Sequence, residues 1–538
     1  MAIHPRTTTV PAPYVVPTTD RWDGSDGAWS TFSISIGTPP QSFRVLVSTL
    51  GQETWVPVPE GCTSLDPSNC ADSRGVETFN SAASPGFRTN ASSTWELIGL
   101  YDLGLETALN YSGNGLFGYD TVRLGSGQDP DAISVAHQVV AGIAAKDYFL
   151  GLLGLNAMSS SFSSVSEPVD SLLHSLKQQN GIPSLSYSYT AGASYRFKKV
   201  PGSLILGGYD RSRFEVPGFN FTFASEHNRD LIVGVQSIVA SNSLQGVVSL
   251  TLSGHLSLID STIPHIWLPE DVCERFEKAF GLTYDPSTDL YLVNETAHAK
   301  LLELSPSITF KLGNSIYTSD NASTNIVLPY AAFDQQVSWP YYTNATYNYF
   351  PIRRGANETQ YQIGRTLLQE AYLVVDQERR NFSIGQTIFS DPLPEVDLVA
   401  ILSPNDSALG GLKTDSSGLS TGAIVGIAIG ALVVVLVIVA IIFLRRRHRR
   451  RSPLIPEVAE DQAAPEQEHV PVAQLDGLPV HELAASHAPA GLKRKCTPPQ
   501  ELSGAMDDTA IFELPSTVAY EMDATELRRE GTGRGDVR

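Results

Sequence analysis

Two stretches of the chain, residues 46–57 and 258–269, share one pattern of residue types and differ at the position best suited to chemistry. Each stretch has two apolar residues, a short polar residue and a hydroxyl residue. A Trp follows seven positions after the polar residue, and an aliphatic residue and Pro come next. The short polar residue is Ser48 in the first copy and Asp260 in the second. A carboxylate can take or give a proton, whereas a serine hydroxyl becomes a nucleophile only beside a base.

Three residues of the sequence are candidate bases for Ser48, namely Asp260, His265 and Glu53. A carboxylate alone is a poor base for a serine, and this type of catalysis depends strictly on geometry. We therefore do not expect Ser48 to act as a nucleophile. The alternative role for Asp260 is structural, with its carboxylate bonded to Ser48 or Ser261.

The elements that must position these residues are short β segments separated by Gly, Pro, Asn and Ser, which fill residues 28–395. The clearest segments are 31–37, 43–47, 121–125, 203–208 and 371–376. Helical patterns are few, and the best of them cover 168–178 and 270–280. The sequence therefore predicts an all-β fold built from two related halves.

Six segments, in order along the chain, resemble those of the pepsin family of aspartic proteases: 36–41, 55–57, 118–122, 151–155, 206–210, and 363–364 with 371–376. The resemblance implies a bilobal all-β fold in which each lobe supplies one Asp. In that family the paired carboxylates share a proton and activate a water molecule. The layout is similar to that of the membrane-anchored fungal cell-surface members.

The resemblance also implies a degenerate site, because Ser48 stands where the family has its first Asp and Asp260 is the lone retained carboxylate. Hydrolysis by a dyad needs one ionised and one protonated carboxyl side by side, and a single carboxylate cannot fill both roles. Leu50 and Thr262 replace the glycines of the two loops, and we expect their side chains to crowd the site. Losing one member of a cooperating catalytic set costs on the order of 10⁴ to 10⁶ in rate.

The chain is predicted to have six parts, with a membrane span near its last quarter. Residues 422–444 carry no charge, and at about 1.5 Å per residue a helix of this length crosses a bilayer. A basic run at 445–451 marks the cytoplasmic side. The parts are an N-terminal segment (1–27), an N-terminal lobe (28–195), a C-terminal lobe (196–396), a stalk (397–421), the transmembrane helix (422–444) and a disordered cytoplasmic tail (445–538).

Glycosylation sequons support an extracellular N-terminus, because all nine precede the apolar run and residues 445–538 contain no Asn. The nine are Asn90, Asn110, Asn220, Asn294, Asn321, Asn344, Asn357, Asn381 and Asn405. Cys62 and Cys70 lie eight apart in a loop-like stretch, which predicts a small disulfide in an oxidising compartment and leaves Cys273 unpaired. Residues 1–20 lack the apolar core of a secretory signal, so we expect the true start to lie upstream.

The chain carries a formal net charge of −20, which argues against nucleic acid as a partner. No metal-ligand spacing or phosphate-binding loop occurs in the sequence, so no metal and no cofactor is predicted. Gly422, Gly426 and Gly430 form a small-residue stripe that allows the transmembrane helix to pair.

These observations favour a single-pass glycoprotein of the plasma membrane or cell surface, catalytically inactive, that binds a peptide, protein or glycan ligand in its cleft. Two alternatives stay open. One is a membrane-anchored aspartic endopeptidase that works at acidic pH, and the other is a purely structural surface glycoprotein.

Overall fold

The computed structural model describes residues 10–162, 168–225, 229–319 and 322–404, all of which belong to one compact unit. These residues are mostly β-strands, as the sequence predicts. The predicted transmembrane helix, its glycine stripe and the tail lie outside the described residues. Within the described residues, no helix has both the length and the apolar character needed to cross a membrane.

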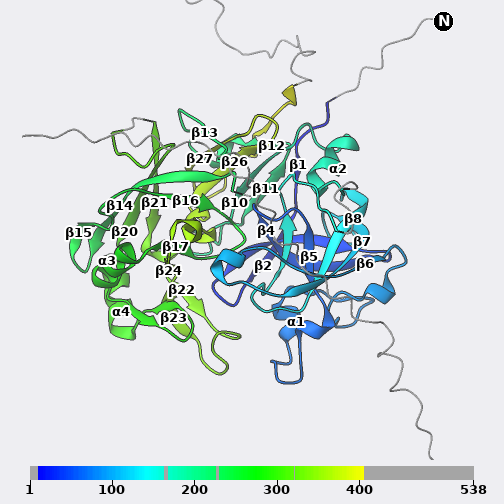
Figure 1. Cartoon of the computed structure of the whole chain (residues 1–538), viewed down its shortest axis with the longest axis horizontal. Helices are drawn as coiled ribbons and strands as arrows, with labels where there is room; N and C mark the ends of the chain where they lie inside the picture. The colour runs from blue at the N-terminus through cyan, green and yellow to red at the C-terminus, as the bar shows by residue number, and fades with distance from the viewer. Residues whose placement is uncertain (1–9, 163–167, 226–228, 320–321, 405–538) are drawn as a thin grey trace, which may run out of the picture. The chain divides into compact units, whose positions relative to one another are not determined.

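An eight-stranded sheet forms the N-terminal half, drawn in blue and cyan in Figure 1. Its strands, in spatial order, are β2 (Thr18–Asp23), β3 (Trp29–Ile36), β4 (Gln41–Ser48), β9 (Gly151–Gly154), β5 (Thr54–Pro57), β8 (Ser134–Ile143), β7 (Asn114–Arg123) and β6 (Glu96–Asp102). Two helices, α1 (Cys70–Ser73) and α2 (Leu172–Gln178), accompany it. Helix α2 begins where the Ser171 side chain accepts a hydrogen bond from the backbone N–H of His174, as an N-cap should.

A second large sheet forms the C-terminal half, drawn mainly in green in Figure 1. Its strands are β21 (Ser323–Pro329), β20 (Ser307–Gly313), β14 (Ile232–Ser243), β16 (His255–Ile259), β25 (Gln362–Ile363), β17 (Ile266–Pro269) and β24 (Ile352–Gly355), with β15 (Gly246–Ser249) on β14. A four-stranded sheet adjoins it, made of β18 (Thr283–Asp285), β19 (Leu290–Leu292), β23 (Tyr347–Phe350) and β22 (Gln335–Val337). The helices of this half are α3 (Glu270–Phe280), α4 (Glu295–Leu304) and α5 (Arg365–Leu368).

A six-stranded sheet joins the two halves, and Figure 1 places its labels between them. Its order is β1 (Tyr14–Val15), β11 (Ser203–Leu206), β10 (Ser186–Thr190), β26 (Ala371–Asp376), β27 (Asn381–Gln386) and β13 (Phe221–Thr222). The pairing of β10 with β26 is antiparallel, with Tyr187 opposite Val375. A small sheet pairs β12 (Gly208–Asp210) with β28 (Leu398–Ala400). Short 3-10 turns complete the fold: η1 (Pro59–Gly61), η2 (Thr89–Ala91), η3 (Thr107–Leu109), η4 (Arg211–Arg213), η5 (Tyr330–Ala332) and η6 (Glu358–Gln360).

The sequence repeat corresponds to a repeat in strand pairing. In the first half, β4 runs parallel to β9, β9 antiparallel to β5, and β5 parallel to β8. In the second half, β16, β25, β17 and β24 pair with the same directions in the same order. Ser48 is the last residue of β4, and Asp260 directly follows β16. The two loops that begin at these residues are therefore related by the repeat.

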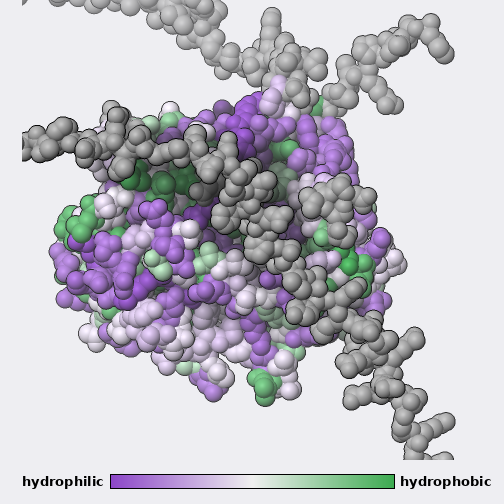
Figure 2. All heavy atoms as spheres, viewed as in Figure 1, coloured by the Kyte–Doolittle hydropathy of each residue, from purple (hydrophilic) through white to green (hydrophobic). Residues whose placement is uncertain are grey.

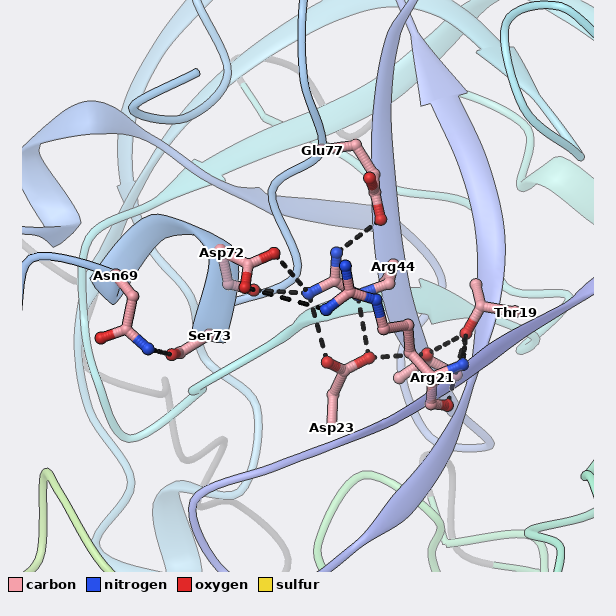
Figure 3. A network of polar contacts seen from close by, with 9 residues as sticks. Thr19, Arg21, Asp23, Arg44, Asn69, Asp72, Ser73 and Glu77 are labelled. Atoms are coloured by element: carbon pink, nitrogen blue, oxygen red, sulfur yellow. Dashed lines mark hydrogen bonds and ion pairs between the residues drawn. The ribbon is translucent and has the colours of Figure 1, made fainter. Parts of the chain in front are cut away.

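Buried Arg44 is the centre of an ionic network at the edge of the first sheet (Figure 3). Its side chain on β4 is 2% exposed, and Nε donates to Asp23 Oδ2 at 3.0 Å. Nη1 donates to Glu77 Oε1 at 2.5 Å, and Nη2 donates to the backbone O of Asp72 at 2.5 Å. One guanidinium thus ties β2, β4 and the segment after α1 together.

The visible surface is mostly hydrophilic, with apolar residues in small separate groups (Figure 2). One group lies over β15, where Val247 is 76% exposed. Six of the described sequon Asn residues are exposed and therefore open to modification: Asn90, Asn110, Asn220, Asn294, Asn344 and Asn357. Asn381 is half-buried. Asn321 and Asn405 lie outside the described residues.

The predicted disulfide between Cys62 and Cys70 is confirmed, and Cys273 is a buried free thiol on α3. The bridge closes a loop with a sequence separation of 8. Closing a loop of this size in the unfolded chain is expected to contribute about 2–3 kcal/mol to stability. We expect the double variant Cys62→Ala, Cys70→Ala to lose about that much free energy of unfolding in urea titrations. An unchanged midpoint would contradict this prediction, and Cys273→Ala tests the effect of removing the thiol that forms no bridge.

Candidate active site

Ser48 is fully buried at the end of β4, and its hydroxyl is engaged on both sides. The backbone N–H of Gly51 donates to Ser48 Oγ at 2.7 Å, and Ser48 Oγ lies 2.6 Å from Thr262 Oγ1. The position of Ser48 in the first loop therefore brings it to the second loop, as the repeat predicts. Ser48 itself contacts the second loop through the hydroxyl of Thr262 and not through a carboxylate.

Asp260 is buried just after β16, and donors surround one of its oxygens. Asp260 Oδ1 accepts hydrogen bonds from Thr262 N at 2.9 Å, Thr262 Oγ1 at 2.7 Å and Thr49 Oγ1 at 3.2 Å. Its partners are thus Thr262 and Thr49 rather than Ser48 or Ser261. Because Thr262 Oγ1 donates to Asp260, Ser48 is the donor in the bond between the two hydroxyls.

The hydroxyl of Thr262 consequently bridges Ser48 and Asp260 and fills the space between them. A water molecule placed to attack a peptide bond would need that space and a free carboxylate face on both sides. Leu50, by contrast, is partly buried and packs against the hydrophobic core. Of the two residues that replace the loop glycines, Thr262 is the one whose side chain forms hydrogen bonds with Ser48 and Asp260.

Neither of the other candidate bases contacts Ser48. Glu53 accepts hydrogen bonds from Ser160 Oγ at 2.7 Å and from Trp55 Nε1 at 3.1 Å, and burial raises its pKa. His265 is fully buried, and burial holds its pKa well below the usual value. Among the described residues, Ser48 therefore has no hydrogen bond to a base, which supports the expectation that it is not a nucleophile.

Reciprocal hydrogen bonds join the loop that follows β4 to the loop that follows β16. Thr49 N donates to Ser261 Oγ at 3.0 Å, and Ser261 N donates to Thr49 Oγ1 at 3.0 Å. Ser261 Oγ in turn donates to Val47 O at 2.7 Å. Behind the second loop, buried Arg365 donates from Nη1 to the backbone O atoms of Ser261 at 2.9 Å and Thr262 at 2.7 Å. The loop geometry is therefore held rigidly although the chemistry has changed.

Residues 103–113, the covering segment, connect β6 to β7 and lie over both loops. Leu109 packs with Ile263 and Trp267. On the second half, Gln360 Nε2 donates to the backbone O of Ala108 at 2.6 Å. The cavity lined by Tyr111 and Thr262 measures about 20 Å³. That is room for about one water molecule and too little for a peptide.

Glu106, in the covering segment, is a second buried carboxyl of the site, and sequence reasoning missed it. Glu106 Oε2 accepts a hydrogen bond from Gln362 Nε2 at 2.8 Å. Burial raises its pKa well above the ordinary value, and the charge of the neighbouring Asp260 carboxylate raises it further. No local pattern around Glu106 could have revealed this, because its partners come from the other half of the chain.

The described residues contain no group of three or more His, Cys, Asp or Glu side chains arranged to hold a metal ion. The polar side chains that meet at the two loops are carboxyls and hydroxyls. As placed, these groups bind one another and leave no carboxylate pair facing a substrate.

Comparison with known proteins agrees with this architecture. Residues 31–387 match the family described as eukaryotic aspartyl protease. Pepsin B of Canis lupus familiaris is 25% identical over 297 residues, which span 52% of this chain and 64% of that protein. Candidapepsin-1 of Candida albicans is 24% identical over 365 residues, or 66% and 81% of the two chains. Because the family match covers well over half of the sequence, this chain belongs to the eukaryotic aspartyl protease family.

Proposed function

We propose that this chain is a non-hydrolytic member of the aspartyl protease family that binds a peptide ligand at the cell surface. The observation that carries the first part is the bridge from Ser48 through Thr262 to Asp260. Where the family has its two paired carboxylates, this chain has a series of hydroxyls, from Ser48 through Thr262, that ends on the Asp260 carboxylate. Such a series can stabilise the loops, but it cannot activate water from two sides.

The ligand would bind outside the two loops, in a pocket of about 510 Å³ at the outer end of the covering segment. Trp267, Tyr341 and Arg353 line it on the second half, and Lys146 and Asp147 line it on the first. Arg353 lies over the rings of both Trp267 and Tyr341, at 5.4 and 6.0 Å from their centroids. Aromatic faces beside charges of both signs suit a peptide with polar side chains.

The surface location rests on the sequence, through the apolar run at 422–444 and the sequons before it. The exposed sequons of the described part and the Cys62–Cys70 disulfide agree with an oxidising, extracellular setting. We propose a single-pass topology with the described domain outside and residues 445–538 in the cytoplasm.

Peptide binding is tested with a labelled peptide library and the purified full-length protein. We expect saturable binding that Tyr341→Ala weakens by about tenfold or more, because the pocket loses an aromatic wall. Tyr317→Ala is the matched control, since Tyr317 is 67% exposed and does not line this pocket. Asn110 also lines the pocket, so binding is measured before and after glycosidase treatment. Binding of wall oligosaccharides in place of peptides would contradict the peptide assignment, and binding of neither would favour a structural glycoprotein.

A further inference from the structure

The covering segment is held over the active-site loops mainly by side chains and by single hydrogen bonds. Its own ends pair where Leu103 N donates to Gly113 O at 2.9 Å. Between them, Glu106 and Asn110 flank the turn η3, with φ angles of 58° and 63° in the left-handed region. Residues other than glycine adopt this region seldom, so the closed conformation depends on the contacts that surround it. The contacts of Glu106 are therefore decisive for closure.

Glu106 and Asp260 are neighbours. Each has one buried carboxyl oxygen, Glu106 Oε1 and Asp260 Oδ2, that receives no hydrogen bond from a donor among the described residues. The other oxygen of each group is occupied, by Gln362 and by Thr262 with Thr49. Two buried carboxylates in contact would repel each other, but one proton between them converts the contact into a strong hydrogen bond.

We propose that Glu106 and Asp260 form a proton-dependent latch that holds residues 103–113 closed over the two loops. When Glu106 is protonated, its hydroxyl donates a hydrogen bond to the Asp260 carboxylate, and the covering segment remains closed over the two loops. When Glu106 loses this proton, two negative charges face each other in a buried site, and the segment lifts into water to separate them.

The direction of the pH effect follows from the shift in the pKa of Glu106. The closed form raises its pKa well above the ordinary value of 4.5 through burial and the charge of Asp260. The closed form therefore binds the proton more tightly than the open form. The preference for the closed form over the open form is complete below about pH 4.5. Above this pH the ratio of closed to open protein falls by up to about tenfold per pH unit, as expected for one proton.

Other groups also face Glu106. Arg229, from the segment before β14, contributes a positive charge that lowers the pKa of Glu106. Tyr111 lies in the covering segment itself, and Tyr148, from the loop after β8, donates its hydroxyl to the backbone O of Leu105. Burial raises the pKa of both tyrosines, so both remain neutral. Gln362, on β25, does not titrate.

The pair does not act as a replacement catalytic dyad. Access for a substrate requires the covering segment to move, and that movement carries Glu106 away from Asp260. The test of the latch uses no ligand and no activity, so its outcome is distinguishable from that of the peptide-binding test.

Hydrogen exchange of the amides of residues 103–113 in the full-length protein tests the latch. Protection factors, corrected for the intrinsic exchange rate, are compared at about pH 5 and pH 7. We expect the protection factor to fall by up to about a hundredfold over these two pH units. Glu106→Gln keeps a neutral donor for Asp260 at every pH, so its protection factor should change by less than about twofold.

Two further variants complete the design. Asp260→Asn removes the charge that raises the pKa of Glu106, so its opening should begin at a lower pH than in the natural protein. Glu96→Gln, an exposed position on β6 of the same hairpin, should behave as the natural protein does. The latch is refuted if protection is constant from pH 5 to 7 in the natural protein, or if Glu106→Gln responds to pH as the natural protein does.

Discussion

The purified protein is expected to leave a peptide library uncut from about pH 3 to 7, because the dyad chemistry of the family needs two free carboxyls. Ser48 and Asp260 are joined through Thr262, and the cavity that Thr262 lines measures about 20 Å³. Relative to a member with an intact dyad, we expect a rate lower by at least on the order of 10⁴. The measurement is mass-spectrometric detection of cleaved peptides, with pepsin B as the positive control.

Substitutions in the loops separate the contributions of the missing carboxylate and the added hydroxyl. Ser48→Asp alone should not restore efficient cleavage, because Thr262 still occupies the space between the two positions and the covering segment still closes the site. Ser48→Asp combined with Thr262→Gly clears that space and should give weak turnover. Robust cleavage by the natural protein that Asp260→Asn abolishes would overturn the proposed function. Efficient cleavage by Ser48→Asp alone would show that Thr262 is no obstacle.

Replacement of Arg44 by Gln is expected to lower the free energy of unfolding by about 3–5 kcal/mol, because it leaves the largely buried Asp23 carboxylate without its cation. Arg44 is 2% exposed, and its main partner Asp23 is 10% exposed. Figure 3 shows Asp23, Asp72 and Glu77 converging on this one guanidinium. The measurement is urea denaturation followed by circular dichroism.

Arg21→Gln is the matched control for Arg44. Arg21 lies on neighbouring β2, is 58% exposed and is 3.9 Å from Asp72, which is itself exposed. Exposed ion pairs contribute about 0–1 kcal/mol, so this variant should unfold almost as the natural protein does. Equal losses in the two variants would mean that burial does not decide the strength of the Arg44 network.

Local patterns in the sequence were enough for most elements of the fold. Alternating apolar residues and turn residues predicted strands that the structure confirms as β3, β4, β7, β11 and β26. The helix predicted at 270–280 is α3, whose buried residues Val272, Phe276 and Ala279 follow helical spacing. The disulfide followed from the spacing of Cys62 and Cys70. These features depend on residues that are close together in the sequence, which is the range over which a sequence pattern can be recognised.

The sequence by itself determined the repeat, and with it the facing positions of Ser48 and Asp260 and the absence of one carboxylate. Only the tertiary structure decided what surrounds them. Thr262 bridges to Ser48 across a sequence separation of 214, and Gln362 holds Glu106 across a separation of 256. Such contacts leave no periodic trace in the chain, because they depend on how two halves pack and on which polar groups burial forces to pair. Thr262 is therefore part of the site, while Leu50, at the related position in the first loop, is partly buried and packs against the core.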